Sequence, residues 1–136
     1  MTRYKDYGER YLNVATAQDD YVFTRGRRRF CLWAASGDTQ EFVVCDLLLE
    51  AVLNAAQPGP EGWHGILLEY HCNLDWLDAS WPIPDVAAVI STLASVPGKA
   101  IAAQPFGNEA LTMLPELLEF LAEAVATKQP VILSKT

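Results

Sequence analysis

Apolar residues recur at helical spacing near the C-terminal end of the chain, with acidic residues on the opposite side of the same helix. The apolar set is Leu114, Leu117, Leu118, Leu121 and Val125, and the polar set is Glu116, Glu119, Glu123 and Thr127. A proline deep inside a helix costs about 3 kcal/mol, whereas one in the first turn costs little. Because of Pro115, we expect this helix to begin near Thr112 or Met113, after a separate turn at 108–111.

Two further helices are predicted upstream. In the first, over 39–57, polar residues recur every three or four positions and leave one narrow stripe on an otherwise apolar helix. The stripe consists of Asp46, Glu50, Asn54 and Gln57. Asp38 or Thr39 can cap this helix, which we expect to be the central core helix. The second runs from Val86 to about Val96, with Asp85 as its cap and Pro97-Gly98 after its end.

Runs of β-branched and aromatic residues predict the strands. They cover 21–24, 30–33, 63–72, a short stretch at 99–103, and an edge strand at 130–134. The arginine-rich segment 25–29 is predicted as the turn between the first two strands. Residues 9–18 favour a short helix, and 73–84 an irregular loop. The expected fold class is α+β (or α/β), with a single-layer mixed sheet of about four to five strands and about three to four helices.

The length of 136 residues predicts one globular domain over 1–136, which can bury about two thirds of its unfolded surface. Apolar runs are far shorter than the roughly 20 residues that cross a bilayer, and the N-terminus has no apolar signal segment. We therefore expect a cytoplasmic protein without membrane contact. Cys31, Cys45 and Cys72 are odd in number and widely spaced, which favours buried reduced thiols over disulfides or zinc.

Charge is distributed unevenly along the chain. Residues 1–30 hold seven Lys or Arg against four Asp or Glu, whereas 31–136 hold three against thirteen, for a net charge of −7. An acidic body of this kind repels nucleic acid and acidic membranes and attracts basic protein surfaces. The basic cluster of Arg25, Arg27, Arg28 and Arg29 is therefore interpreted as a solvated turn, and no nucleic-acid partner is expected.

No motif for nucleotide binding, zinc proteolysis, serine hydrolysis or calcium binding occurs in the sequence. His64, His71 and Cys72 come from one segment, but on a strand residues 64 and 72 face one way and 71 the other. We therefore expect Cys72 in the core and His71 exposed or hydrogen-bonded. No catalytic residue, metal site or cofactor is predicted.

The segment 69–85 combines carboxylates with aromatic residues and holds no Lys or Arg. Trp and Tyr concentrate binding energy in protein interfaces, and clustered carboxylates steer a cationic partner toward them. The alternative is that the indoles pack in the core and the carboxylates are solvated. The predicted partner-binding residues are Glu69, Tyr70, Asp75, Trp76, Asp78, Trp81 and Asp85.

In size, charge and this aromatic–acidic segment, the chain resembles immunity proteins of bacterial toxin systems, including those of contact-dependent inhibition. The resemblance implies an acidic inhibitor that caps the active surface of a basic toxin domain, often a nuclease. Two alternatives stay open. One is a dimeric secretion-type chaperone, and the other is a small hydrolase that uses His64 or His71 with a nearby carboxylate.

If the segment 69–85 meets a basic partner, replacing Asp75 and Asp78 together by Lys should slow association and leave the thermal unfolding midpoint nearly unchanged. Association kinetics with the purified partner and a thermal melt measure the two effects. Unchanged binding combined with lost stability would identify the segment as a structural loop instead.

Overall fold

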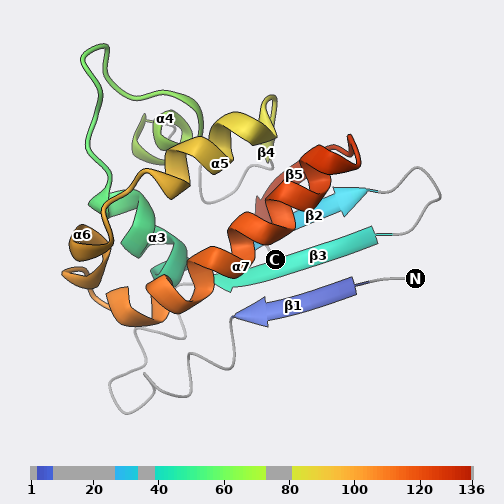
Figure 1. Ribbon diagram of the computed structural model, residues 1–136, viewed down its shortest axis with the longest axis horizontal. Coiled ribbons are helices and arrows are strands. Elements are labelled where there is room, and N and C mark those ends of the chain that lie inside the picture. Colours follow the sequence, from blue (N-terminus) through green and yellow to red (C-terminus); the bar gives the residue numbers. More distant parts are fainter. Residues whose placement is uncertain (1–2, 8–26, 34–38, 73–80, 136) are drawn as a thin grey trace.

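The structure is a computed structural model that describes residues 3–7, 27–33, 39–72 and 81–135. Its five strands form one mixed sheet in the order β1-β3-β2-β5-β4 (Figure 1). They are β1 (Arg3–Tyr7), β2 (Arg27–Trp33), β3 (Thr39–Cys45), β4 (Trp81–Pro82) and β5 (Val131–Lys135). β1 is parallel to β3, and the other neighbouring pairs are antiparallel. The two-residue strand β4 and the strand β1 therefore form the edges of the sheet.

Five helices are described beside this sheet. They are α3 (Asp46–Ala55), α4 (Gly65–Cys72), α5 (Val86–Ala94), α6 (Gly98–Ala102) and α7 (Gly107–Ala126). The longest helix, α7, crosses in front of the sheet in the view of Figure 1 and contacts α3, α5 and α6. Helix α4 lies further out and contacts α5. Helices α3, α5 and α6 therefore lie against α7, and α4 lies against α5.

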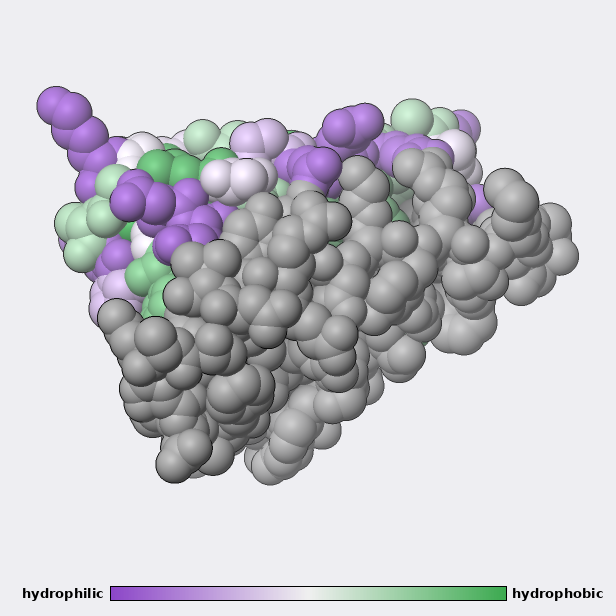
Figure 2. Space-filling model, turned by 90° about the horizontal axis from the view of Figure 1, so that it is seen from below, coloured by the Kyte–Doolittle hydropathy of each residue, from purple (hydrophilic) through white to green (hydrophobic). Residues whose placement is uncertain are grey.

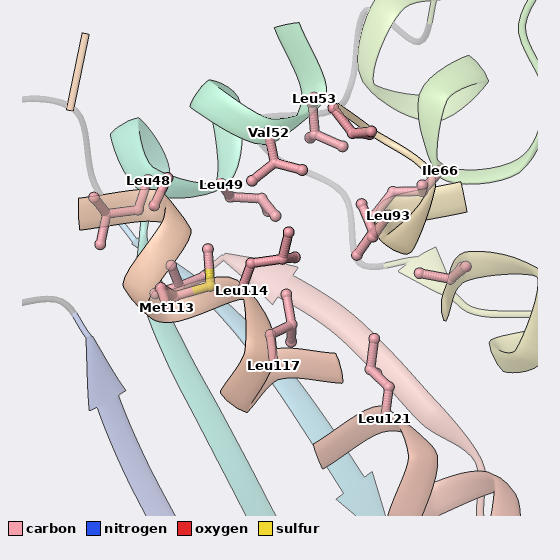
Figure 3. Packing of buried hydrophobic residues seen from close by; sticks show 14 of the residues in the cluster. Leu48, Leu49, Val52, Leu53, Ile66, Leu93, Met113, Leu114, Leu117 and Leu121 are labelled. Atoms are coloured by element: carbon pink, nitrogen blue, oxygen red, sulfur yellow. The ribbon is translucent and has the colours of Figure 1, made fainter. Parts of the chain in front are cut away.

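The buried side of α7 connects the sheet to the other helices. Its buried residues are spaced by three or one positions, as one helix face requires, and are Gly107, Ala110, Met113, Leu114, Leu117, Phe120, Leu121 and Ala124. The ring of Phe120 lies 5.7 Å from that of Phe42 in β3, at a tilt of 48°. Figure 3 shows Met113, Leu114 and Leu117 of α7 beside Leu49 and Val52 of α3. The core thus forms where α7 lies between the sheet and α3.

The predicted central helix is confirmed from Asp46 onward, but its first turns are a strand. In α3 the residues from Leu48 to Leu53 are buried except the half-buried Glu50, and Asn54 is exposed on the predicted polar stripe. Residues 39–45 form β3, in which Phe42 and Val44 are fully buried. The two-residue spacing of these side chains is the strand period, so the segment pairs with β1 and β2 instead of extending the helix.

The predicted cap at Asp85 is confirmed. Its extended backbone precedes α5, and its Oδ1 accepts a hydrogen bond of 3.1 Å from the backbone N–H of Ala88. This bond satisfies one of the N–H groups that the first helical turn leaves without a partner. Helix α5 ends at Ala94, close to the predicted end.

Two predicted strands are helices. Residues 65–72 form α4, in which the neighbours Ile66 and Leu67 are both buried while Leu68 is 44% exposed. Such a pattern is incompatible with strand alternation. Residues 98–102 form α6, and its buried Ile101 lies in the core. In both segments tertiary burial on α5 or α7 overrides the local β preference of the sequence.

Helix α7 begins at Gly107, five or six residues before the predicted start at Thr112 or Met113, and runs through Pro115 without a break. Proline at this position removes one backbone N–H donor, a loss that the extensive burial of the helix offsets. The buried face also differs slightly from the prediction, since Val125 is 42% exposed.

The predicted fold class is wrong, because helices dominate the described chain and the sheet comes largely from other segments. Helices hold 10, 8, 9, 5 and 20 residues and strands 5, 7, 7, 2 and 5, so helical residues are roughly twice as many. Among the predicted strands that fall on described residues, 30–33 and 130–134 overlap the sheet, and 63–72 and 99–103 do not. Strand β5 lies between β2 and β4, not at an edge. Arg27, Arg28 and Arg29 belong to β2 and not to a turn.

Several predictions fall outside the described residues, namely the helix at 9–18, the strand at 21–24, and Asp75, Trp76 and Asp78 in the predicted loop. Within the described part of the chain, every helix is too short or too polar to cross a membrane.

Gly107 is predicted to be intolerant of a side chain. A Cβ at this position would lie 1.9 Å from the carbonyl oxygen of Ile101, a backbone atom that cannot swing away. Gly107→Ala should therefore lower the free energy of unfolding by about 2 kcal/mol or more, measured by urea denaturation.

Gly98 provides the matched control, since it is also the first residue of a helix and its added Cβ would lie 3.8 Å from the side chain of Leu111. Gly98→Ala should change stability by less than about 1 kcal/mol. Equal effects of the two substitutions would show that α6 and α7 do not approach as closely as described.

Candidate functional site

Two adjoining pockets form a groove between α4 and α5 within the described residues. These pockets are its two lobes, and His64 and Thr92 line both of them. The larger lobe encloses about 360 Å³ and is lined mainly by small and apolar residues. The smaller lobe encloses about 110 Å³, and its wall includes Trp81 and Asp85.

Local turns and caps fix the walls of this groove. The N–H of Gly62 donates to the carbonyl of Gly59 at 3.0 Å, and the φ of 92° at Gly62 is one that glycine adopts without strain. This turn closes one end of the larger lobe. Asp85 lies in the smaller lobe because it caps α5, and Thr92 lies two turns further along the same helix.

His64 immediately precedes α4, and its carbonyl accepts a hydrogen bond of 3.4 Å from the N–H of Leu68. It is exposed and lines both lobes. Asp85 lines the smaller lobe too, but within the described residues no hydrogen bond or ion pair joins it to His64. The pair shares a pocket without forming the hydrogen-bonded acid–base couple that general base catalysis uses.

His71 holds α4 against the end of α3. Its ring stacks on Trp63 with a centroid distance of 3.9 Å and an interplanar angle of 17°. Its Nε2 lies 3.2 Å from the carbonyl oxygen of Leu53. A carbonyl can only accept, so Nε2 carries the hydrogen in this contact. Leu53 is in the last turn of α3, where carbonyls lack partners within the helix, and His71 therefore acts as a cap supplied by another helix.

Tyr70 makes a second connection between the same two helices. Its hydroxyl donates to Oδ1 of Asn54 at 3.0 Å, and its ring meets that of His71 edge-on at 4.8 Å. Tyr70 is half-buried. Because its hydroxyl bonds to Asn54 of α3, Tyr70 helps to fix α4 in place.

The structure separates the predicted partner-binding residues into two groups. Trp81, half-buried, and Asp85, exposed, line the same small lobe. Glu69 and Tyr70, both half-buried on α4, are absent from the lining of the groove. The remaining three, Asp75, Trp76 and Asp78, lie outside the described residues.

Cys72 is exposed with a free thiol, so the prediction that it lies in the core is wrong. The prediction assumed strand alternation, whereas Cys72 is the last residue of a helix whose buried side is at Ile66 and Leu67. His71 is exposed and hydrogen-bonded, as predicted. Among the described residues no three His, Cys, Asp or Glu side chains cluster as a metal ion would require.

Sequence reasoning missed most of the groove. The unassigned lining residues are Ala56, Gln57, Leu67, Thr92, Ser95, Val96 and Pro97. Thr92 follows Asp85 by seven residues, and Ser95 follows Thr92 by three. These spacings place the three residues along one side of α5. This signal was present in the sequence, but it identifies a groove only if the segment 65–72 is known to be a helix.

Comparison with protein-family models, with curated proteins and with solved structures finds no match to this chain. The function is therefore inferred from the geometry and charge of the molecule itself.

The two histidines are predicted to differ in their contribution to stability. His71→Ala removes the ring stack on Trp63 and the hydrogen bond to the end of α3, and should lower the free energy of unfolding by about 1–2 kcal/mol. His64→Ala removes an exposed ring without such contacts and should change it by less than about 0.5 kcal/mol. Chemical denaturation of both variants measures the difference, and a larger loss for His64→Ala would contradict the assigned roles.

Proposed function

We propose that this protein is a binding protein that neutralises a basic partner, of the kind found in bacterial toxin systems, by covering the partner's active surface with its helical side. The observation that carries the proposal is the division of charge between the helices and the strands.

Acidic residues gather in the helices and basic residues in the strands. The five described helices contain one lysine, Lys99, and seven acidic residues, which are Asp46, Glu50, Glu69, Glu109, Glu116, Glu119 and Glu123. The five strands contain two acidic residues and six basic ones, which are Arg3, Lys5, Arg27, Arg28, Arg29 and Lys135. A surface of one sign accelerates the approach of an oppositely charged partner.

Figure 2 shows the molecule from below, a face away from α4 and α5, and the described residues on that face mix hydrophilic and apolar side chains. Interfaces of non-obligate complexes use aromatic side chains as anchors. Trp63, Tyr70 and Trp81 are half-buried around α4 and β4, so each retains some accessible surface. These features support a protein-binding role for the side of the molecule that carries α4 and α5.

The two alternatives receive less support from the described residues. The exposed large apolar side chains there are Leu68 and Val125, which lie on different helices, whereas a chaperone holds an unfolded segment along an extended exposed apolar surface. For a hydrolase, His64 and Asp85 share a lobe, but Oδ1 of the carboxylate already accepts the hydrogen bond that caps α5.

The test is to capture partners from the source cells with the tagged chain, purify the basic proteins that elute with salt, and assay one of them with defined components. The proposal requires that an equimolar amount of this chain abolish the activity of such a partner. It also requires an association rate that falls as ionic strength rises, because salt screens the steering charges. Unaffected activity, or an association rate insensitive to salt, would contradict the proposal.

A matched pair of charge reversals locates the contact. Glu61 is exposed in the turn beside the groove, and Glu119 is exposed on α7. Glu61→Lys should slow association about threefold to tenfold at low salt, whereas Glu119→Lys, with the same net charge, should have a smaller effect. Equal slowing would place the contact elsewhere than the α4–α5 side.

A further inference from the structure

We infer that the small lobe of the α4–α5 groove is a binding site for an arginine side chain presented by a protein partner. The inference rests on the proposed function for the basic character of that partner, and it adds the chemical group that the site recognises.

The first observation is the composition of the lobe. A carboxylate, Asp85, and an indole, Trp81, line one concave space of about 110 Å³, together with the imidazole of His64. This space admits a group of a few heavy atoms, such as a planar guanidinium. Arginine is attracted to both kinds of wall, since it pairs with carboxylates through two N–H donors and stacks on aromatic faces.

The second observation is that the carboxylate of Asp85 has unused capacity. Oδ1 accepts the N–H of Ala88, and among the described residues Oδ2 has no hydrogen-bond partner and no cation lies within ion-pair distance. The side chain is exposed but held by its capping role. An incoming guanidinium therefore meets a fixed carboxylate and breaks no ion pair of the described chain, which keeps the cost of binding low.

The third observation concerns the neighbouring lobe. The lining of the larger lobe contains no Asp, Glu, Lys or Arg. Leu67, Val96 and Pro97 make this lobe largely apolar. A partner segment with an apolar residue next to the arginine would fill both lobes. His64 lies at their junction, and a ring nitrogen of its imidazole that carries no hydrogen can accept a hydrogen bond from the guanidinium.

The test uses short peptides and the ¹⁵N-labelled full chain. The probes are acetyl-Gly-Arg-Leu-Gly-amide, the same peptide with citrulline in place of arginine, and the same peptide with lysine. Citrulline keeps the shape of arginine and removes its charge. The arginine peptide should shift the Trp81 indole N–H and the amide signals of Asp85 and Ala88 in a saturable manner. It should bind about threefold to tenfold more tightly than either other peptide.

Asp85→Asn is the decisive variant, because asparagine caps helices as well as aspartate does but carries no charge. It should retain the wild-type thermal midpoint within a few degrees and bind the arginine peptide as weakly as the wild type binds the citrulline peptide. Glu119→Gln, an equal loss of charge on α7, should leave peptide binding unchanged. Equal binding of the arginine and citrulline peptides, signals that move elsewhere, or no saturable shift would overturn the site, and equal binding of the lysine peptide would overturn the choice of arginine.

The site and the proposed function fail separately. If Asp85→Asn inhibits the purified basic partner as tightly as the wild type does, the inhibitor role stands and the arginine site is not its anchor. If the peptides bind as expected but no basic partner is inhibited, the site stands and the proposed function is wrong.

Discussion

The packing of α7 against the sheet is the contact on which the rest of the structure depends. Phe120 meets Phe42 of β3, and the same helix contacts α3, α5 and α6. Burial of apolar side chains at about 25 cal/mol per Å² is the main force that holds such layers together. Because α5 contacts α7 and α4 contacts α5, the position of the groove is set by α7 even though α7 contributes no residue to its lining.

What the sequence could predict was local. Asp85 was identified as a cap because an aspartate directly before an apolar helical run typically caps the helix. The core character of α3 followed from its narrow polar stripe. The prediction of a strand at 65–72 was wrong because Ile, Leu and Tyr fit a strand or a helix equally well. Contact with α5 decides in favour of the helix. The same error hid the groove, since its two walls are α4 and α5. It also joined Tyr70 to Trp81 in one patch, whereas in the structure Trp81 lines the small lobe and Tyr70 does not line the groove.

The division of charge shows what a linear count cannot. The sequence places basic residues early and acidic residues late, and this alone does not determine whether the two kinds mix on the folded surface. In the structure the early basic residues enter β1 and β2, whereas the late acidic residues enter helices. The uneven distribution of charge along the sequence therefore becomes a difference in charge between the sheet and the helices. Such a difference is what an oriented encounter with a charged partner requires.

The way in which α4 is attached has a mechanical consequence. One side of the groove, α5, rests on α7 and cannot move without disturbing the core. The other side, α4, is held by its contact with α5, by the burial of Ile66 and Leu67, by two hydrogen bonds to the end of α3, and by the stack of His71 on Trp63. Segments with fewer buried contacts open at lower free energy than the rest of a protein. We therefore expect the α4 side of the groove to yield before the α5 side when a side chain enters, whereas the carboxylate of Asp85 belongs to the side that rests on α7.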